Sequence, residues 1–154
     1  MLWLEKEELD NTTQQALLTL WNQEYPFNVH HPSLASLQGY LNQLNSPEHT
    51  LVEFEGRLVA WLATFNREGC RWFAMIVDGN FQGKGLVRQL LKKAQAKNKS
   101  LLGWAVDHDR YTKADGSPYP SPIGFYLKNS FELLPDQRFE NEQLSAAMIQ
   151  WNAP

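Results

Sequence analysis

Between residues 77 and 88 the chain reads Val77-Asp78-Gly79-Asn80-Phe81-Gln82-Gly83-Lys84-Gly85-Leu86-Val87-Arg88, a strand end, a glycine turn and the start of an amphipathic helix. Glycines let a backbone approach an anion closely, and the first helical turn offers N–H groups without intrahelical partners. The stretch is therefore predicted to hold a diphosphate. A purely structural turn is the alternative, because two glycines before a helix are common. The spacing of glycine and lysine fits neither a P-loop nor a Rossmann fingerprint.

The segments next to this turn are predicted to form a sheet and its covering helix. Residues 72–77 are an unbroken apolar run, which indicates a central strand covered on both faces. Before it, residues 50–54 and 58–65 flank Glu55-Gly56 and predict a hairpin. After the turn, a helix over residues 85–97 places apolar side chains at helical spacing toward the core, and residues 101–106 form another strand.

The two ends of the chain complete the predicted order. A short strand at residues 2–4 precedes two helices, one capped by Asp10 or Asn11 and ended by Pro26, the other from about Ser33 to a point before Ser46-Pro47. A polar loop from Asp107 to Tyr119 leads to a short helix that Ser121 caps and that runs through Leu127. Two strands follow, at residues 131–139 and 144–151. The order β-α-α-β-β-β-α-β-α-β-β predicts a mixed α/β fold with one central sheet.

Composition limits the classes of protein. The 154 residues are expected to form a single domain, 1–154. We expect a soluble cytoplasmic protein without membrane contact, because no apolar run approaches the roughly 20 residues of a membrane span and the first residues do not resemble a signal peptide. One cysteine, Cys70, excludes an internal disulfide. A net charge of −3 argues against nucleic acid and favours a small molecule or a protein as partner. The oligomeric state is open, a homodimer included.

The glycine turn resembles a motif of the GNAT superfamily of acyl-CoA-dependent N-acetyltransferases, Gln/Arg-x-x-Gly-x-Gly/Ala between the fourth strand and the third helix. The match is at the first and fourth positions, and Val87 stands where the family has a small residue. The resemblance covers about residues 50–151 and implies a GNAT fold of about seven mostly antiparallel strands and four helices. It also implies that acetyl-CoA is bound by the strand end and the turn, at Ile76, Val77, Gln82, Gly83, Lys84, Gly85, Leu86, Val87 and Arg88.

A second match lies 44 residues after Gln82. The stretch Gly124-Phe125-Tyr126-Leu127-Lys128-Asn129-Ser130-Phe131 is similar to the family's aromatic-Tyr-x-x-x-Gly-Phe, with Ser130 in place of glycine. In the family the tyrosine hydroxyl lies beside the sulfur of CoA and protonates the departing thiolate, and the resemblance gives this role to Tyr126. Without the motif, Tyr126 would be read as a core aromatic whose hydroxyl bonds a neighbour.

The base that accepts the proton of the amine is less clear from the sequence. Many family members carry a glutamate in the fifth strand, but here that strand contains none. Candidates near the strand ends are Asp78, Asp107, His108 and Asp109, and His108 is the tentative base because its intrinsic pKa suits proton transfer near neutral pH. A loop histidine in solvent is the alternative. No metal site is expected, since Asp107-His108-Asp109 has no further ligand cluster near it in the sequence.

The acceptor side is predicted only by region. Relatives border the acceptor with the segment between the first two helices, here containing Trp21, Glu24, Tyr25, Phe27, His30 and His31. The loop of residues 107–120 is a departure from relatives and carries Tyr111 and Tyr119, either as an acceptor wall or as a surface excursion. The sequence thus predicts an N-acetyltransferase that moves an acetyl group from acetyl-CoA to a primary amine. A non-catalytic acyl-CoA-binding or sensory domain and a protein-interaction module are the alternatives.

Overall fold

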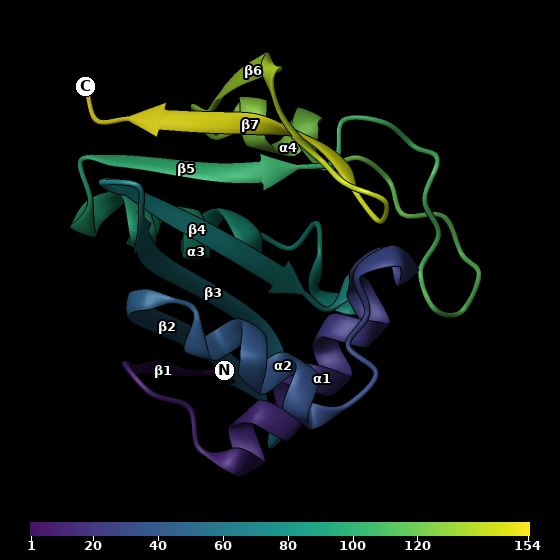
Figure 1. The fold of residues 1–154 in the computed structure, drawn as a ribbon. Helices are drawn as coiled ribbons and strands as arrows, with labels where there is room; N and C mark the ends of the chain where they lie inside the picture. Colours follow the sequence, from purple (N-terminus) through teal and green to yellow (C-terminus); the bar gives the residue numbers. More distant parts are fainter.

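The computed structural model describes residues 1–154, and its centre is one sheet of seven strands in the order β1-β2-β3-β4-β5-β7-β6 (Figure 1). The helices and strands follow the predicted order. The strands are β1 (Leu2–Lys6), β2 (Asn45–Phe54), β3 (Arg57–Arg67), β4 (Cys70–Val77), β5 (Ser100–Ala105), β6 (Glu132–Glu140) and β7 (Ser145–Asn152). The helices are α1 (Asn11–Glu24), α2 (Leu34–Asn42), α3 (Leu86–Lys97) and α4 (Ile123–Lys128), with 3-10 turns at Phe27–Val29 and Gly79–Phe81.

Local sequence signals begin and end the helices much as predicted. The side chain of Asp10 accepts a hydrogen bond from the N–H of Thr13 and caps α1, and the side chain of Ser33 accepts one from Ser36 and caps α2. The start of the last helix differs, because α4 begins at Ile123 with Pro122 as its capping residue. The hydroxyl of Ser121 still accepts a hydrogen bond from the N–H of Ile123, at 3.3 Å, as the side chain of a capping residue does.

The prediction for the start of β2 was wrong. The strand begins at Asn45, whereas the residues before position 49 were read as the end of a helix and a turn. A register shift between Asn45 and Glu48 leaves Ser46 and Pro47 without partners in β3. This irregularity accommodates Pro47, which has no N–H to give to the ladder, so a proline that marks a break in sequence lies here inside a strand.

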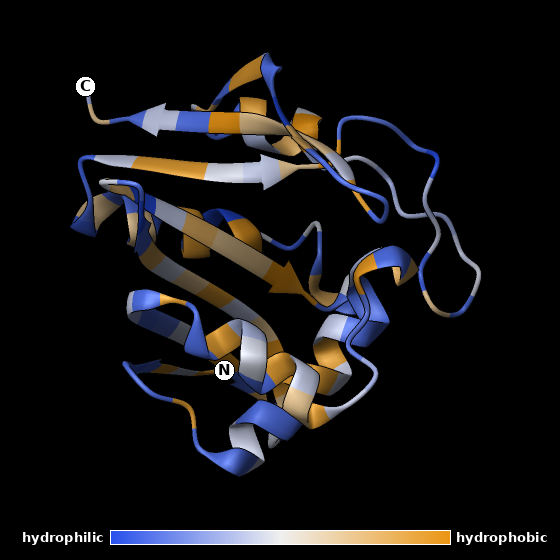
Figure 2. Cartoon of the chain, in the orientation of Figure 1, coloured by the Kyte–Doolittle hydropathy of each residue, from blue (hydrophilic) through white to orange (hydrophobic).

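Two apolar clusters cover the two faces of the sheet. Helices α1 and α2 pack on one face with Trp61 and Trp72, and α3 and α4 pack on the other with Phe73 and Ile149 (Figure 1). Figure 2 shows the apolar colour along β3 and β4 and on the inward sides of the helices. The buried residues of α3 are Leu86, Leu90, Leu91 and Ala94, which confirms the predicted inward face except that Val87 is half-buried. None of the helices combines the length and the apolar character needed to cross a membrane.

The middle of the sheet is divided, because β4 and β5 run parallel but pair at one point only. That point joins Trp72 to Leu102, and past it the two strands diverge (Figure 1). All other neighbouring strands are antiparallel and pair over five or more positions. The edge of β4 from Phe73 to Val77 therefore has no neighbouring strand, which leaves room between the two halves of the sheet.

Buried His49 in β2 leads to a prediction about pH. Its Nδ1 accepts a hydrogen bond from Nε1 of Trp61 at 3.0 Å, and burial lowers the pKa of His49 from 6.5 to about 4. The unfolded chain then binds more protons between these two values. The neutral ring therefore contributes stability fully above pH 6.5 and loses it as the pH falls to 4, by up to about 3 kcal/mol.

Urea unfolding at pH 7 and at pH 4.5 measures this contribution. The matched variant His49→Gln keeps an acceptor for Trp61 but does not titrate, so it should lack this part of the pH dependence. Equal losses of stability in wild type and variant between the two pH values would contradict the assignment to His49.

Candidate functional site

The predicted anion turn begins where β4 ends, and its first half is tightly fixed. Asp78 is 1% exposed, accepts a hydrogen bond from the N–H of Asn80, and pairs with Arg57 at 2.9 Å. The N–H of Asp78 donates to the carbonyl of Val59, so the start of the turn is bonded to β3. Gln82 reaches back, and its Nε2 donates to the carbonyl of Val77 at 3.0 Å. The route of the chain into α3 is thus set by contacts within the turn and by contacts of Asp78 with β3.

The second half of the turn leaves its donors free. Gly83 and Gly85 have φ of +76° and +85°, a backbone region that favours glycine, and Gly85 is the N-cap of α3. The first helical bond runs from Gln89 to the carbonyl of Gly85, and none of the six N–H groups from Gly83 to Arg88 donates to a protein acceptor. Exposed Lys84 and Arg88 add positive charge. Such a run of donors at a helix N-terminus fits a diphosphate.

The open edge of β4 offers a second set of free backbone groups. In an antiparallel strand, the N–H and C=O groups of successive residues point to opposite sides. Asp78 bonds to β3, so Ile76 also faces β3, whereas Met75 and Val77 face the gap toward β5. Their carbonyls are used by side chains, since the hydroxyl of Tyr25 donates to Met75 at 3.1 Å and Gln82 donates to Val77. Their N–H groups point to a side where no strand pairs.

A cavity of about 590 Å³ fills the gap between β4 and β5 and joins these two sets of donors. It is lined by 32 residues, of which 21 are hydrophobic. They come from α1 and the segment after it, α2, strands β3, β4 and β5, the glycine turn and the start of α3, the loop before α4, α4 itself and the β6–β7 hairpin. Because the cavity passes between the halves of the sheet, a ligand held at the turn can meet a second ligand that enters from the α1 and α2 face.

Tyr126 in α4 lines this cavity opposite β4. Its side chain is nearly buried, with 8% of the residue exposed, and its ring packs against Phe73 and Phe131. Its hydroxyl forms no hydrogen bond with the protein. Burial raises the pKa of Tyr126 well above its ordinary value, and neighbouring Tyr119 raises it further. The group is therefore a neutral phenol at physiological pH, without a protein partner, on a residue that lines the cavity.

The loop of residues 107–120 closes the cavity near the end of α1. Figure 1 shows it reaching from β5 to the carboxyl end of α1, where the N–H of Phe27 donates to the carbonyl of Thr112. Buried Glu24 pairs with Lys113 at 3.0 Å and accepts a bond from the N–H of Gly79. Tyr119 lines the cavity, and burial together with the charge of Glu24 raises its pKa to about 12. The loop is therefore part of the wall, as one of the two readings of the sequence expected.

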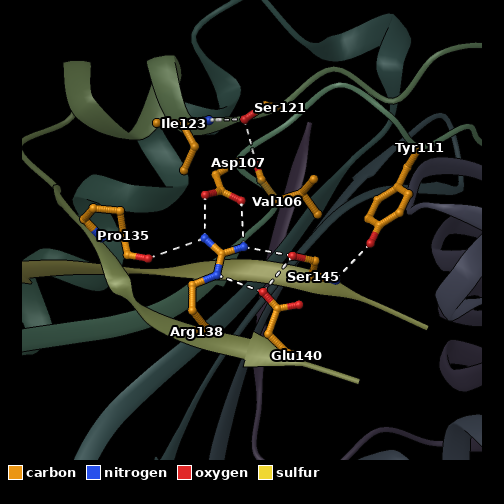
Figure 3. Close-up of polar contacts among 9 residues, drawn as sticks. All are labelled: Val106, Asp107, Tyr111, Ser121, Ile123, Pro135, Arg138, Glu140 and Ser145. Atoms are coloured by element: carbon orange, nitrogen blue, oxygen red, sulfur yellow. Dashed lines mark hydrogen bonds and ion pairs between the residues drawn. The ribbon is translucent and has the colours of Figure 1, made fainter. Parts of the chain in front are cut away.

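The carboxylates proposed as bases have structural partners. Figure 3 shows Asp107 bound by both terminal nitrogens of Arg138, which also contacts Glu140 and Ser145. The guanidinium of Arg138 holds the pKa of Asp107 below its usual range. Asp109 accepts from the N–H of Ser121, whose hydroxyl donates to Val106 at 2.6 Å. The bonds of Ser121 thus tie the start of α4 to the segment that follows β5, and the bond from the N–H of Ser145 to the hydroxyl of Tyr111 ties the loop to β7 (Figure 3).

His108 lies outside the cavity lining. Its Nδ1 accepts a bond from the N–H of Arg110 at 3.2 Å, its Nε2 is buried without a partner, and its ring meets Tyr111 edge-on. No three His, Cys, Asp or Glu side chains gather in a cluster that could hold a metal ion.

The cavity brings together most but not all of the residues singled out in the sequence. It unites Val77, Gln82, Gly83, Gly85, Val87 and Arg88 with Ile76 and Tyr126. Three predicted residues lie outside the lining: exposed Lys84, Leu86 in the core, and His108. Of the acceptor region, Trp21, Glu24 and Tyr25 line it, and Phe27, His30 and His31 do not. Met75, Tyr40 and Arg67 were missed. Strand alternation could have suggested Met75 once Val77 was chosen, but no local signal in the sequence relates Tyr40 and Arg67 to the turn.

The comparisons with known proteins agree with this arrangement. A family model described as the acetyltransferase (GNAT) family matches residues 14–128. The fold is similar to that of an acyl-CoA N-acyltransferase from Pseudomonas aeruginosa, with 17% identity, a TM-score of 0.69 and 97% of each chain covered. An aminoglycoside 6'-N-acetyltransferase from Enterococcus faecium gives 14% identity and a TM-score of 0.67, over 100% of this chain and 98% of that one.

A third similar structure is PaiA N-acetyltransferase from Thermoplasma acidophilum in complex with coenzyme A. Its identity is 11% and its TM-score 0.62, over 99% of this chain and 100% of that one. At these identities the solved structures establish the likeness of fold. No curated protein matches the chain.

Proposed function

The chain belongs to the GNAT acetyltransferase family, and from this premise we propose that it transfers the acetyl group of acetyl-CoA to the primary amine of a small molecule by direct attack. The observation that carries the proposal is the run of free N–H groups from Gly83 to Arg88 at one end of a cavity that Tyr126 also lines. Backbone donors suited to phosphate and a hydroxyl suited to act as an acid thus belong to the same cavity.

The residues of the turn would hold the diphosphate of acetyl-CoA. The free N–H groups from Gly83 to Arg88 donate to its oxygens, and the side chains of Lys84 and Arg88 add charge. Gln82 acts indirectly, because its side chain ties the turn to Val77. The pantetheine arm would pair with the open edge of β4 at Met75 and Val77. Ile76, which the resemblance names, contributes through its place in the ladder with β3.

The free N–H groups of Met75 and Val77 are suited to stabilise charge at the reacting carbonyl. Acetyl-CoA supplies the acetyl group as a thioester that a neutral amine can attack. As the C–N bond forms, negative charge grows on the carbonyl oxygen, and backbone N–H groups fixed in a strand stabilise it without reorganising. The C–S bond then breaks, and Tyr126 gives its proton to the departing sulfur. No covalent bond to the enzyme is needed.

The acceptor amine must lose a proton before or during the attack, and the cavity itself favours this loss. An apolar lining disfavours a charged ammonium and thereby lowers the pKa of a bound amine. We propose that the amine loses one proton to water on entry. After the C–N bond has formed it loses a second proton, which water carries to the oxygen of Tyr126, so that Tyr126 is neutral again and the reaction needs no dedicated base.

This proposal predicts a small effect of changing His108. The variant His108→Gln should keep kcat/KM for acetyl transfer within about threefold of wild type, the size of an ordinary surface substitution. Initial rates of CoA release from pH 6 to pH 9 check it. A loss of a hundredfold or more, together with the disappearance of an acidic limb from the pH profile, would instead establish His108 as the base.

The proposed function is tested on the wild-type chain with acetyl-CoA and a panel of primary amines. Release of the CoA thiol should depend on the amine, mass spectrometry should find the acetylated amine, and calorimetry should find one site for acetyl-CoA. Binding of acetyl-CoA without release for any amine would favour a non-catalytic acyl-CoA-binding domain. Absence of both binding and release would overturn the assignment of the cavity to acetyl-CoA.

A further inference from the structure

The end of the cavity on the α1 and α2 face is enclosed by aromatic rings. They come from helices and strands that are far apart in sequence, namely Trp21, Tyr25, Tyr40, Phe65, Trp72 and Trp104. The rings contact one another, with 5.0 Å between the centroids of Trp21 and Tyr40 and 5.2 Å between those of Trp72 and Trp104. An acceptor that enters here meets rigid apolar walls, which favour an apolar or aromatic body over a strongly hydrated one.

The charges of the whole cavity are unbalanced. Its lining contains three cations, Arg67, Arg88 and Lys113, and one carboxylate, Glu24, a formal charge of +2 in a chain whose net charge is −3. The carboxylate is already neutralised, because Glu24 is 7% exposed and pairs with Lys113 at 3.0 Å. The two charges without a partner are Arg67 and Arg88, both positive. A polycationic acceptor therefore meets no free carboxylate here.

Arg67 is the unpaired cation at the acceptor end. It lies at the end of β3, half-buried, and forms no ion pair or hydrogen bond, while the carboxylate nearest in sequence, Glu68, lies in the exposed turn that follows. Its guanidinium carbon lies 5.0 Å from the ring centre of Phe65 and 5.2 Å from that of Trp72. Stacking on rings fixes the plane of a guanidinium and leaves the N–H groups along its edge available for a carboxylate.

The position of Arg67 limits the shape of the acceptor. Its guanidinium lies over Trp72, and Trp72 precedes Met75 by three residues of β4. The free N–H of Met75 is the nearer of the two that we propose for the reacting carbonyl. A strand rises about 3.3 Å per residue, so Trp72 and Met75 are about 10 Å apart along the strand. The amine and the carboxylate of an α-amino acid are separated by only two covalent bonds and do not span this distance.

From these observations, and on the premise of the proposed transferase function, we infer the class of the acceptor. It is a small molecule with a primary amine at one end, an apolar or aromatic spacer, and a carboxylate at the other end that Arg67 binds. The amine reaches the open edge of β4 at Met75 while the spacer lies among the aromatic rings. Arg67 is thus a specificity-determining residue and takes no part in the bond-making step.

Two matched pairs of amines test the inference. The long pair is ω-aminooctanoate and octylamine, of which only the first has a carboxylate, at the end opposite the amine. The short pair is phenylalanine and phenethylamine, of which only phenylalanine has a carboxylate, next to the amine. The measured quantity is the ratio of kcat/KM within each pair, from CoA release. The long pair should favour the carboxylate by about tenfold, the worth of one charge-assisted contact at a half-buried site. The short pair should show no such preference, and spermidine should be poorer than ω-aminooctanoate.

Variants assign the preference to Arg67. Arg67→Gln keeps a long polar side chain and should bring the ratio of the long pair close to one. Lys92→Gln, which removes the same charge from the exposed face of α3 outside the cavity, should keep the wild-type ratio. A readout without any variant is inhibition of octylamine acetylation in the wild-type chain, where octanoate should inhibit more strongly than octanamide.

The outcomes separate the inference from the function on which it rests. Equal kcat/KM for ω-aminooctanoate and octylamine, a tenfold preference that survives in Arg67→Gln, or better turnover of spermidine would overturn the inference and leave the transferase function standing. Failure of every amine to release CoA would overturn both.

Discussion

Replacing Tyr126 by phenylalanine is expected to lower kcat for acetyl transfer by about 10²- to 10⁴-fold, the range that removal of a general acid gives, with the dissociation constant of acetyl-CoA unchanged. The change deletes one oxygen that has no protein partner, so it leaves no buried group unpaired. The ring still packs on Phe73, at 5.8 Å between centroids, and on Phe131, at 5.4 Å. The loss should therefore appear in the chemical step alone.

The pKa of Tyr126 determines how the difference in rate between wild type and Tyr126→Phe depends on pH. Because burial raises that pKa well above its ordinary value, the hydroxyl keeps its proton through the whole range in which the assay is run. The rate of the wild-type enzyme should therefore not fall at alkaline pH through loss of the Tyr126 proton. The difference between the two proteins should stay the same from pH 6 to pH 9.

The control for the hydroxyl deletion is Tyr111→Phe. Tyr111 also loses an oxygen in this variant, but the residue lies outside the cavity lining and its hydroxyl accepts a bond from the N–H of Ser145. It should lower the unfolding midpoint and spare kcat. If Tyr126→Phe lowered kcat no more than Tyr111→Phe, or acted by weakening the binding of acetyl-CoA, the acid role of Tyr126 would be refuted.

Replacing Gly85 by alanine is the second change with a large expected effect, and it acts on binding. Gly85 has φ of +85°, a conformation that costs alanine about 1–2 kcal/mol. A Cβ there would meet no protein atom within 4 Å, so the folded chain has room for it. The space it would occupy borders the free N–H groups of the turn. We expect the dissociation constant of acetyl-CoA to rise by about 10- to 100-fold, as measured by calorimetry.

Gly69→Ala is the matched control for this change. Gly69 lies in the β3–β4 hairpin with φ of +76°, and a Cβ there also meets nothing within 4 Å, but the residue is not part of the cavity. The two variants should lose similar stability toward urea, and only Gly85→Ala should lose affinity. Equal affinity in both would mean that the turn does not bind the diphosphate.

Much of the fold could be predicted because its signals are local. Asp10 and Ser33 cap the helices that follow them, the pair Glu55-Gly56 turns a hairpin, and the apolar spacing of α3 fixes its buried face. The error at the start of β2 arises from a contact between strands, which no local signal in the sequence shows. Pro47 ends helices and strands in most settings, and only the register shift against β3 permits it inside β2.

The candidate site divides in the same way. The glycine turn offers its own backbone N–H groups as donors, so sequence spacing alone could indicate it, and Tyr126 was predicted from a second local motif. The ion pairs of the candidate carboxylates could not be predicted in this way, because their partners are distant in sequence. Asp78 and Asp107 are each held by an arginine from another strand, Arg57 and Arg138, and no pattern near the two aspartates announces these partners.

By itself, the sequence determined the turn that we propose for the donor: a strand, two glycines and a helix start are contiguous, and the free N–H groups that they offer need no distant residue. The cavity that we propose for the acceptor was decided only by the tertiary structure. The single contact between β4 and β5 at Trp72 and Leu102 opens the sheet, and the opening gathers Tyr40 from α2, Arg67 from β3 and Lys113 from the loop around one cavity. Charge balance in a cavity is a sum over such distant residues, and it exists only once the chain has folded.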